Sequence, residues 1–328
     1  MVDSLPAMDT APARHDWTVA EIEAIYTAPF PDLVFRAQTV HRLHHRPDEI
    51  QGCQLLSIKT GGCPEDCAYC PQSAHYDTPV SRGDLAELAA VEDAARRARE
   101  QGATRFCMGA AWRDVPEGPQ FDRVLEMVRV VRGLGLEACC TLGMLTDAQA
   151  ERLADAGLSA YNHNLDTSPE YYPEIISTRT YDDRLRTLDA VRGAGISVCC
   201  GGIIGMGEGD EDVVDLGLAL RELGVDSLPL NFLHPIPGTP LGDRRPVDAG
   251  RALRALSLMR LLNPEADIRA AGGRERTLGD WQPLVLYPAN SIFVNGYLTT
   301  PGQAAAEARR MCETLGFALE SEIETLEA

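Results

Sequence analysis

Residues 57–73 read SIKTGGCPEDCAYCPQS, and this stretch carries the strongest chemical signal in the 328-residue chain. It places Cys63, Cys67 and Cys70 in a Cys-x-x-x-Cys-x-x-Cys spacing directly after a short apolar segment. Three thiolates on one loop can bind three irons of a 4Fe-4S cluster and leave the fourth iron open to an outside ligand. A zinc loop or three unrelated thiols are the alternatives, although a structural zinc site takes four protein ligands. We therefore expect a 4Fe-4S cluster with one exchangeable iron.

On either side of this loop, short apolar segments alternate with amphipathic helical segments, which is typical of successive βα units and a parallel sheet. The predicted strands are residues 53–58, 104–109, 136–142, 160–164, 196–203, 227–231, 267–270 and 291–294. The predicted helices between them are residues 85–101, 121–132, 147–155, 182–192, 210–223 and 248–262. Glycines are expected to stop five of these helices, at Gly102, Gly133, Gly157, Gly193 and Gly224. Eight strands predict an α/β fold of the TIM-type (β/α)8 barrel class.

The chain is expected to have a single large core with short additions at both ends. Residues 1–47 are predicted to form an N-terminal helical extension with helices over 17–26 and 33–46, and residues 48–300 the barrel core. Residues 301–328 are predicted to form a C-terminal helix and an acidic tail. The segments RGLGLEACC (132–140) and RGAGISVCC (192–200) are alike, so we expect them at equivalent helix-to-strand positions.

Charge and composition narrow the class of protein. A formal net charge of -19 and a pI near 4.7 argue against a nucleic-acid surface, which needs clustered Lys and Arg. No apolar run approaches the roughly 20 residues of a membrane span, and the N-terminus lacks the order of a signal peptide. We expect a cytoplasmic protein without a membrane segment. Because cytosolic thiols stay reduced, its ten cysteines favour metal or cluster binding over disulfides.

A second set of cysteines lies on predicted strands. Cys107, Cys139 and Cys199 belong to three different strands, and inward-facing residues of parallel barrel strands share one lumen. Alternation lets only one residue of each adjacent Cys-Cys pair face inward, so a register shift by one would exchange the pair. Three such thiols can hold a second cluster. The other barrel and tail cysteines are interpreted as small buried packing residues: Cys53, Cys140, Cys200 and Cys312.

The first cysteine loop resembles the radical S-adenosylmethionine (SAM) superfamily. In that superfamily the open iron binds the methionine end of SAM, whose cleavage gives a 5'-deoxyadenosyl radical. By this resemblance Tyr69 lies near the adenine. Residues 201–208, GGIIGMGE, fit the superfamily's Gly-x-Ile-x-Gly-x-x-Glu pattern, which implies an adenine-side backbone edge with Gly201, Ile203 and Glu208 as cofactor contacts.

A closer resemblance is to the biotin synthase family. It rests on SIKTGGCPEDCAYCPQS, TRFCMGAAW, LEACCTLG, YNHNLDTSPEYY, STRTYDDRL and ANSIF, which together run from residue 57 to residue 293. This resemblance implies that Cys107, Cys139 and Cys199 bind a 2Fe-2S cluster whose fourth ligand is Arg269. Arginine is an unusual ligand, because its guanidinium is normally charged and has no acceptor lone pair.

Several polar residues are expected around the substrates. The strand end YNHNLD places Asn162, Asn164 and Asp166 where barrel enzymes keep active-site groups, although an Asx-rich turn is the alternative. By the resemblance, Asn164 and Asp166 contact SAM and Asn162, Asn164 and Asn231 contact dethiobiotin, while alternation turns His163 away. Arg184 matches the family's partner for the SAM carboxylate; otherwise it is a surface helix arginine.

The implied reaction is radical insertion of sulfur into dethiobiotin to form biotin. Side-chain acid-base catalysis cannot break an unactivated C-H bond, so no acid or base is assigned. The resemblance further implies sulfur donation by the 2Fe-2S cluster, a flavodoxin or ferredoxin electron donor, iron-sulfur assembly machinery and a homodimer. Two rivals remain: another radical SAM enzyme, which lacks the barrel cysteines and Arg269, and a non-catalytic iron-sulfur or zinc protein, which leaves the cofactor-like residues unexplained.

Overall fold

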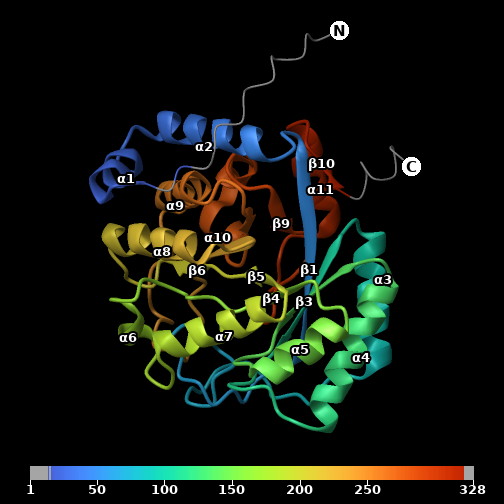
Figure 1. The fold of residues 1–328 in the computed structure, drawn as a ribbon. Coiled ribbons are helices and arrows are strands. Elements are labelled where there is room, and N and C mark those ends of the chain that lie inside the picture. Colours follow the sequence, from blue (N-terminus) through green and yellow to red (C-terminus); the bar gives the residue numbers. More distant parts are fainter. Residues whose placement is uncertain (1–13, 15, 321–328) are drawn as a thin grey trace.

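The computed structural model describes residue 14 and residues 16–320 and contains a closed parallel barrel (Figure 1). Eight strands follow one another in the order β1-β2-β3-β4-β5-β7-β8-β9, and β9 pairs with β1 to close the ring. Their bounds are β1 Glu49–Lys59, β2 Arg105–Ala110, β3 Glu137–Thr141, β4 Ala160–Asn162, β5 Ser197–Cys199, β7 Ser227–Phe232, β8 Asp267–Ala270 and β9 Ser291–Phe293. The predicted TIM-type barrel is therefore confirmed.

The predicted strand 196–203 is wrong in one respect, because it is interrupted. It forms β5 and then β6 (Gly202–Ile204), and both pair with β7 in the same offset. Between them, Gly201 lies so close to β7 that a Cβ on it would come within 1.9 Å of the carbonyl oxygen of Pro229. A proline also lacks the N-H that a strand ladder requires. The break therefore reflects the proline in β7.

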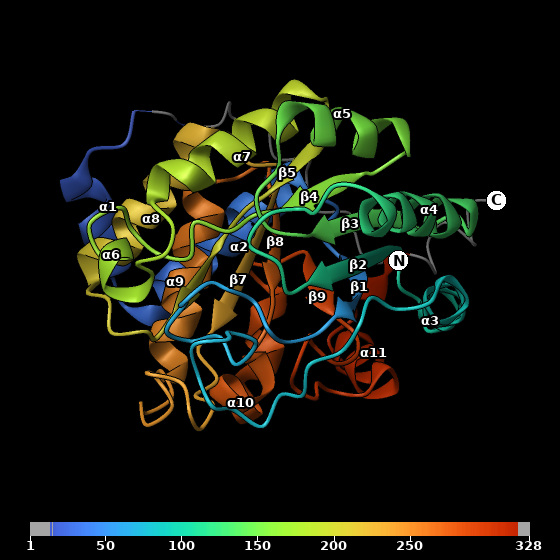
Figure 2. The ribbon, with the colours of Figure 1, turned by 90° about the horizontal axis from the view of Figure 1, so that it is seen from below.

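Helices surround the barrel (Figure 2). Their bounds are α1 Val19–Tyr26, α2 Phe30–His44, α3 Leu88–Glu100, α4 Pro119–Gly133, α5 Asp147–Asp155, α6 Tyr172–Ile175, α7 Tyr181–Gly193, α8 Asp210–Leu223, α9 Ala249–Leu262, α10 Arg274–Leu278 and α11 Ala305–Thr314, with a 3-10 helix, η1, at Gly279–Leu286. Capping boxes begin α5 at Thr146 and α7 at Thr180. The sequence analysis missed α6, α10 and η1, since such short or irregular helices carry little periodicity.

Glycines end several helices, but two predicted positions are wrong. Positive φ angles occur at Gly102, Gly157 and Gly224, as predicted. Gly133 and Gly193 instead remain the last residues of α4 and α7, and the positive φ angles fall two residues later, at Gly135 (79°) and Gly195 (73°). The two similar segments do occupy equivalent helix-to-strand positions, because each runs from the end of its helix into β3 or β5.

The described segments before and after the barrel pack against it and its helices. The predicted N-terminal helices are confirmed as α1 and α2, and α2 packs along α9 (Figure 1). A short strand, β10 (Ala318–Leu319), follows α11 and pairs with the start of β1; the sequence did not predict this strand. Residues 1–13, 15 and 321–328 of the predicted end segments lie outside the described residues. The boundaries at 47 and 300 stay a prediction. Among the described residues, none of the helices is long and apolar enough to cross a membrane.

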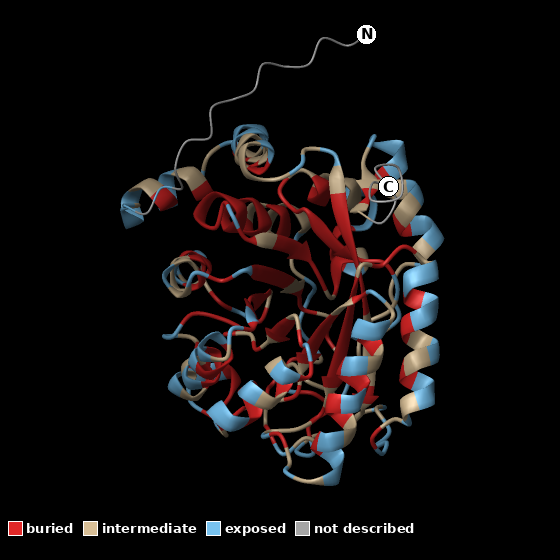
Figure 3. Ribbon diagram, turned by 45° about the vertical axis from the view of Figure 1, so that its right-hand side comes forward, coloured by how far each residue is buried: buried red, intermediate tan, exposed pale blue. Residues whose placement is uncertain are grey.

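The barrel strands are buried, whereas the surrounding helices carry both buried and exposed residues (Figure 3). Cys140 and Cys200 belong to the apolar layer between strands and helices. Cys139 and Cys199 belong to a separate buried cluster that also contains Cys107. The predicted strand register is therefore confirmed, and it turns the second cysteine set into the lumen.

Candidate active site

One cavity of about 350 Å³ unites nearly all the predicted site residues. It opens where the loops leave the carboxyl ends of the strands, the end viewed in Figure 2. The predicted ligands and contacts that line it are Cys63, Cys67, Tyr69, Cys70, Cys107, Cys139, Asn162, Asn164, Asp166, Cys199, Ile203, Asn231 and Arg269. The two cysteine sets, remote in sequence, thus face a single space.

The first cysteine loop is folded by its own backbone. Cys63 N-H donates to the Gln72 carbonyl oxygen at 2.9 Å, and Cys70 N-H donates to the Cys67 carbonyl oxygen at 2.9 Å. Burial raises the pKa of the Cys67 thiol to about 11 and that of Cys70 to about 12. A bound metal would have to displace those protons, so iron binding at this loop releases protons.

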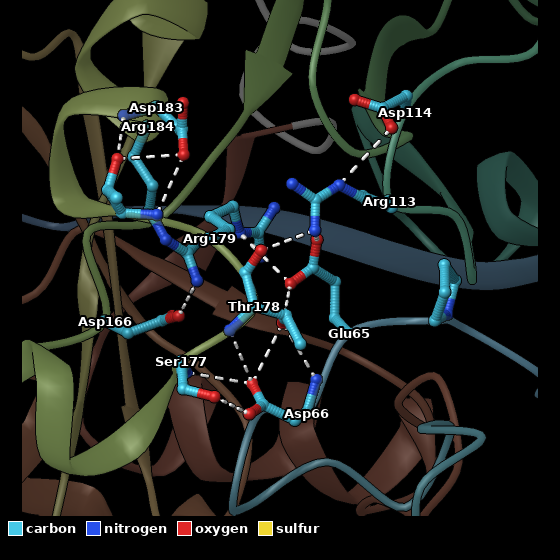
Figure 4. A network of polar contacts seen from close by, with 12 residues as sticks. Glu65, Asp66, Arg113, Asp114, Asp166, Ser177, Thr178, Arg179, Asp183 and Arg184 are labelled. Atoms are coloured by element: carbon cyan, nitrogen blue, oxygen red, sulfur yellow. Dashed lines mark hydrogen bonds and ion pairs between the residues drawn. The ribbon is translucent and has the colours of Figure 1, made fainter.

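A polar network fixes this loop to the segment before α7 (Figure 4). The Asp66 carboxylate accepts hydrogen bonds from the backbone N-H groups of Ser177 (3.0 Å) and Thr178 (3.2 Å). The neighbouring Glu65 is buried, and its carboxylate accepts a hydrogen bond from the Thr178 hydroxyl and pairs with Arg113 at 3.3 Å. Consecutive carboxylates therefore hold the loop against a segment more than 100 residues away.

Arg179 is a cavity residue that the sequence analysis missed. It is 8% exposed, lines the cavity, and its Nε makes no hydrogen bond within the described part of the chain. Its nearest carboxylate oxygen, Oε2 of Glu65, is 4.0 Å from Nε. A buried guanidinium of this kind can bind a carboxylate. Arg179 lies in STRTYDDRL, the same segment that contains Arg184, and this position could have identified it.

The lumen cysteines lie close together. Cys107 and Cys139 are register partners on β2 and β3, and Cys199 belongs to the same buried cluster. The interaction with Cys139 lowers the pKa of Cys199 to about 5 and lowers that of Cys107, while the pKa of Cys139 is raised. Arg269 Nη1 lies 4.0 Å from Cys199 Sγ. These cysteines are suited to metal binding, because thiolate is the form that ligates metal.

Three asparagines line the same cavity as the two cysteine sets. The Asn162 amide nitrogen donates to Asn164 Oδ1 at 2.8 Å and lies 3.4 Å from Cys199 Sγ. Asn231 Oδ1 accepts from Gly272 N-H at 2.9 Å. His163 is buried and does not line the cavity, as alternation predicts.

Asp166 and Arg184 form a buried ion pair beside the cavity (Figure 4). Asp166 has a φ of 71°, the one positive value outside glycine among the described residues, and Tyr69 donates to its Oδ2 at 2.8 Å. Arg184 also donates to the Asn164 carbonyl oxygen (2.5 Å) and to the Tyr172 hydroxyl (2.9 Å). Its side chain does not line the cavity, so it orients Asp166 and Asn164 from behind.

Two further predicted contacts do not line the cavity. Gly201 N-H donates to Asn164 Oδ1 at 3.1 Å. Glu208 accepts from the N-H groups of Gly205 (2.8 Å) and Gly207 (3.0 Å), which closes its own loop. Both therefore shape the backbone next to the cavity.

The donor set fits clusters better than a single ion. Within the described ranges, no three His, Cys, Asp or Glu side chains are grouped to hold one metal ion. In an iron-sulfur cluster the cysteines are distributed over several irons, so the cysteine sulfurs need not converge on one point. Three cysteines on one loop and three in the lumen match that requirement.

Comparisons with known proteins identify the family. The Radical SAM superfamily matches residues 57–220, and the Biotin and Thiamin Synthesis associated domain matches residues 229–318. A biotin synthase of Methylobacterium nodulans is 57% identical over 305 residues, covering 91% of both chains. That of Myxococcus xanthus is 56% identical, covering 88% of this chain and 84% of the relative.

Solved structures support the fold alone, since their identity to this chain is low. Methylornithine synthase superposes with a TM-score of 0.79 at 17% identity, covering 94% of this chain and 96% of that one. The FeFe-hydrogenase maturase of Carboxydothermus hydrogenoformans gives 0.76 at 17% identity, covering 92% and 76%. With the two domain matches and the curated relatives, the chain belongs to the biotin synthase family of the radical SAM superfamily.

Proposed function

We propose that the chain inserts sulfur into dethiobiotin to form biotin. The observation that carries this proposal is the single cavity that is lined by both cysteine sets and by polar side chains. Membership of the family implies a 4Fe-4S cluster and SAM. The 2Fe-2S cluster belongs to the proposal and is supported by the buried set of Cys107, Cys139 and Cys199.

The ligand assignment follows the two cysteine sets. Cys63, Cys67 and Cys70 would hold the 4Fe-4S cluster, and the lumen cysteines the 2Fe-2S cluster, with Arg269 as the fourth ligand by family resemblance. When bound, these groups and SAM supply the radical that removes hydrogen from unactivated carbon and the sulfur that replaces it. No acid or base of the chain is assigned to the chemistry.

The protein's own contribution is to position the reactants. Asn162, Asn164 and Asn231 offer amide donors and acceptors to the ureido ring of dethiobiotin. Asp166 and Tyr69 are placed to meet the adenosine part of SAM, with Gly201, Ile203 and Glu208 shaping the adjoining backbone.

The methionine carboxylate of SAM is assigned to guanidinium groups. Arg184 is the partner implied by the family, but in this structure it is paired with Asp166. Arg179 lines the cavity, and its Nε makes no hydrogen bond within the described residues. We assign the carboxylate contact to Arg179, with Arg184 supporting the site from behind.

Partners and location extend the same proposal. A flavodoxin or ferredoxin would supply electrons, iron-sulfur assembly machinery would restore the sulfur donor, and the enzyme would act as a cytoplasmic homodimer. These assignments rest on the family resemblance.

The test is an anaerobic assay of reconstituted protein with dethiobiotin, SAM and a reductant, comparing wild type with Cys107→Ala and Cys67→Ala. We expect biotin from wild type only. SAM cleavage should persist in Cys107→Ala and disappear in Cys67→Ala. SAM cleavage by wild type without biotin would retain radical chemistry but reject dethiobiotin as substrate.

A further inference from the structure

A fourth thiol lies with the lumen cysteines. Cys53, on β1, is fully buried in the same cluster as Cys107, Cys139 and Cys199. The sequence alone gives it a packing role, since no adjacent motif marks it. Its place in the barrel is different from that of Cys140, which is equally buried but faces the helices.

Cys53 also shares hydrogen-bond partners with Arg269. Cys53 Sγ lies 3.4 Å from Gln51 Oε1 and 3.5 Å from Ser291 Oγ. Arg269 donates to these same two atoms, from Nη2 and Nε, each at 2.9 Å. The Cys53 thiol and the Arg269 guanidinium are therefore linked through shared hydrogen-bond partners.

In this arrangement Arg269 acts as a hydrogen-bond donor. Two of its nitrogens donate to Gln51 and Ser291, and the third points toward Cys199. A protonated guanidinium has no lone pair with which to bind iron. As an iron ligand it would first have to lose a proton, whereas a cysteine binds iron as the ordinary thiolate.

The charges around the lumen can also accommodate a fourth thiolate. Arg105 and Arg269 are both buried in the barrel. Arg105 pairs with Glu137 at 2.7 Å, but no carboxylate pairs with Arg269 among the residues that the structure describes. Buried charges require compensation. Four thiolates around an oxidised 2Fe-2S core leave net negative charge next to these cations.

We propose that Cys53 is a reserve ligand of the second cluster site, whose thiolate takes the fourth ligand position whenever Arg269 does not bind the iron. This inference rests on the proposed function, because it assumes a 2Fe-2S cluster in the lumen. The exchange is not a redox step: the Cys53 sulfur-iron bond forms as the Arg269 nitrogen-iron bond breaks, and the thiol proton passes to the released guanidine of Arg269.

The test uses the full chain reconstituted with iron-57 and compares wild type, Arg269→Leu and the double variant Arg269→Leu/Cys53→Ser. Mössbauer spectra report whether the two irons of a 2Fe-2S cluster are equivalent, and a chelator measures how fast that iron is lost. Arg269→Lys serves as a second variant that keeps a buried cation. Cys140→Ala in the Arg269→Leu background is the matched cysteine control, and thermal unfolding verifies that each variant is folded.

We expect Arg269→Leu to keep a 2Fe-2S cluster with equivalent irons, as four thiolates require. Adding Cys53→Ser should speed loss of that iron by about tenfold or more, whereas adding Cys140→Ala should not. Equal iron retention in the single and double variants would overturn the inference, as would loss of the cluster from both folded Arg269 variants. Failure of the proposed function looks different: wild type itself would then show no 2Fe-2S signal, or Cys107→Ser would leave that signal unchanged.

Discussion

The Asp166–Arg184 pair offers a direct test of how the cavity wall is held. Replacing Asp166 with Asn keeps a side chain that tolerates its positive φ angle, so the change removes mainly the charge. Arg184, 3% exposed, would then be a buried cation without its partner. Breaking one side of a buried pair costs about 3–5 kcal/mol. We expect the free energy of unfolding to fall by roughly that amount.

Urea unfolding of the cofactor-free protein, followed by circular dichroism, measures this loss. The double variant Asp166→Asn/Arg184→Met should be less destabilised than the sum of the single variants, by about 0.5–3 kcal/mol. The exposed pair between Asp183 and Arg186 is the matched control, and Arg186→Met should change stability little. A loss below about 1 kcal/mol in Asp166→Asn, or additive single variants, would refute the argument.

Three further predictions follow. Burial lowers the pKa of His41 to about 3, so the folded state keeps this imidazole neutral. The contribution of neutral His41 to stability is present above about pH 6.5. It is lost as the pH falls from there toward the pKa of His41 in the folded state. Urea unfolding across that window should show a slope of up to about 1.4 kcal/mol per pH unit, and an unchanged slope in His41→Gln would contradict this. Gly201→Ala should destabilise the protein by about 1–3 kcal/mol or more, because the new Cβ would meet a backbone carbonyl of β7. Gly133→Ala serves as the control, since a Cβ at that position has nothing within 4 Å. Equal losses of stability in the two variants, by thermal or urea unfolding, would count against the argument. Arg179→Met should weaken SAM binding roughly tenfold, as measured by equilibrium dialysis. Arg113 does not line the cavity, so an equal effect of Arg113→Met would show that the loss is not specific.

Periodicity and alternation predicted most of the barrel. Helix α5 has the predicted bounds, 147–155, because its capping residue and apolar spacing agree. Alternation correctly placed Asn162 and Asn164 at the cavity and His163 away from it. These features are local, so neighbouring residues in the chain are enough to predict them.

The features that were missed depend on contacts between distant segments. The break at Gly201 is caused by Pro229 on another strand. Pairing of β10 with β1 joins residues more than 250 positions apart, and two residues carry too little pattern to predict a strand. Arg179 becomes a cavity residue because the cysteine loop is held against its segment.

The cluster assignments came from the spacing of one loop and from family resemblance. Composition gave no reason to pair Arg269 with the lumen cysteines. The position of Cys53 beside Arg269 was equally invisible, because it depends on Gln51 and Ser291 from strands that meet only when the barrel closes.

The most direct test of the central claim follows the sulfur atom. The protein is reconstituted with iron and sulfur-34 sulfide, freed of excess sulfide, and given dethiobiotin, SAM and a reductant in unlabelled anaerobic buffer; the mass of the product is then measured. The account predicts biotin that carries sulfur-34 from wild type and no biotin from Cys107→Ala. Biotin with unlabelled sulfur, or labelled biotin from Cys107→Ala, would contradict it.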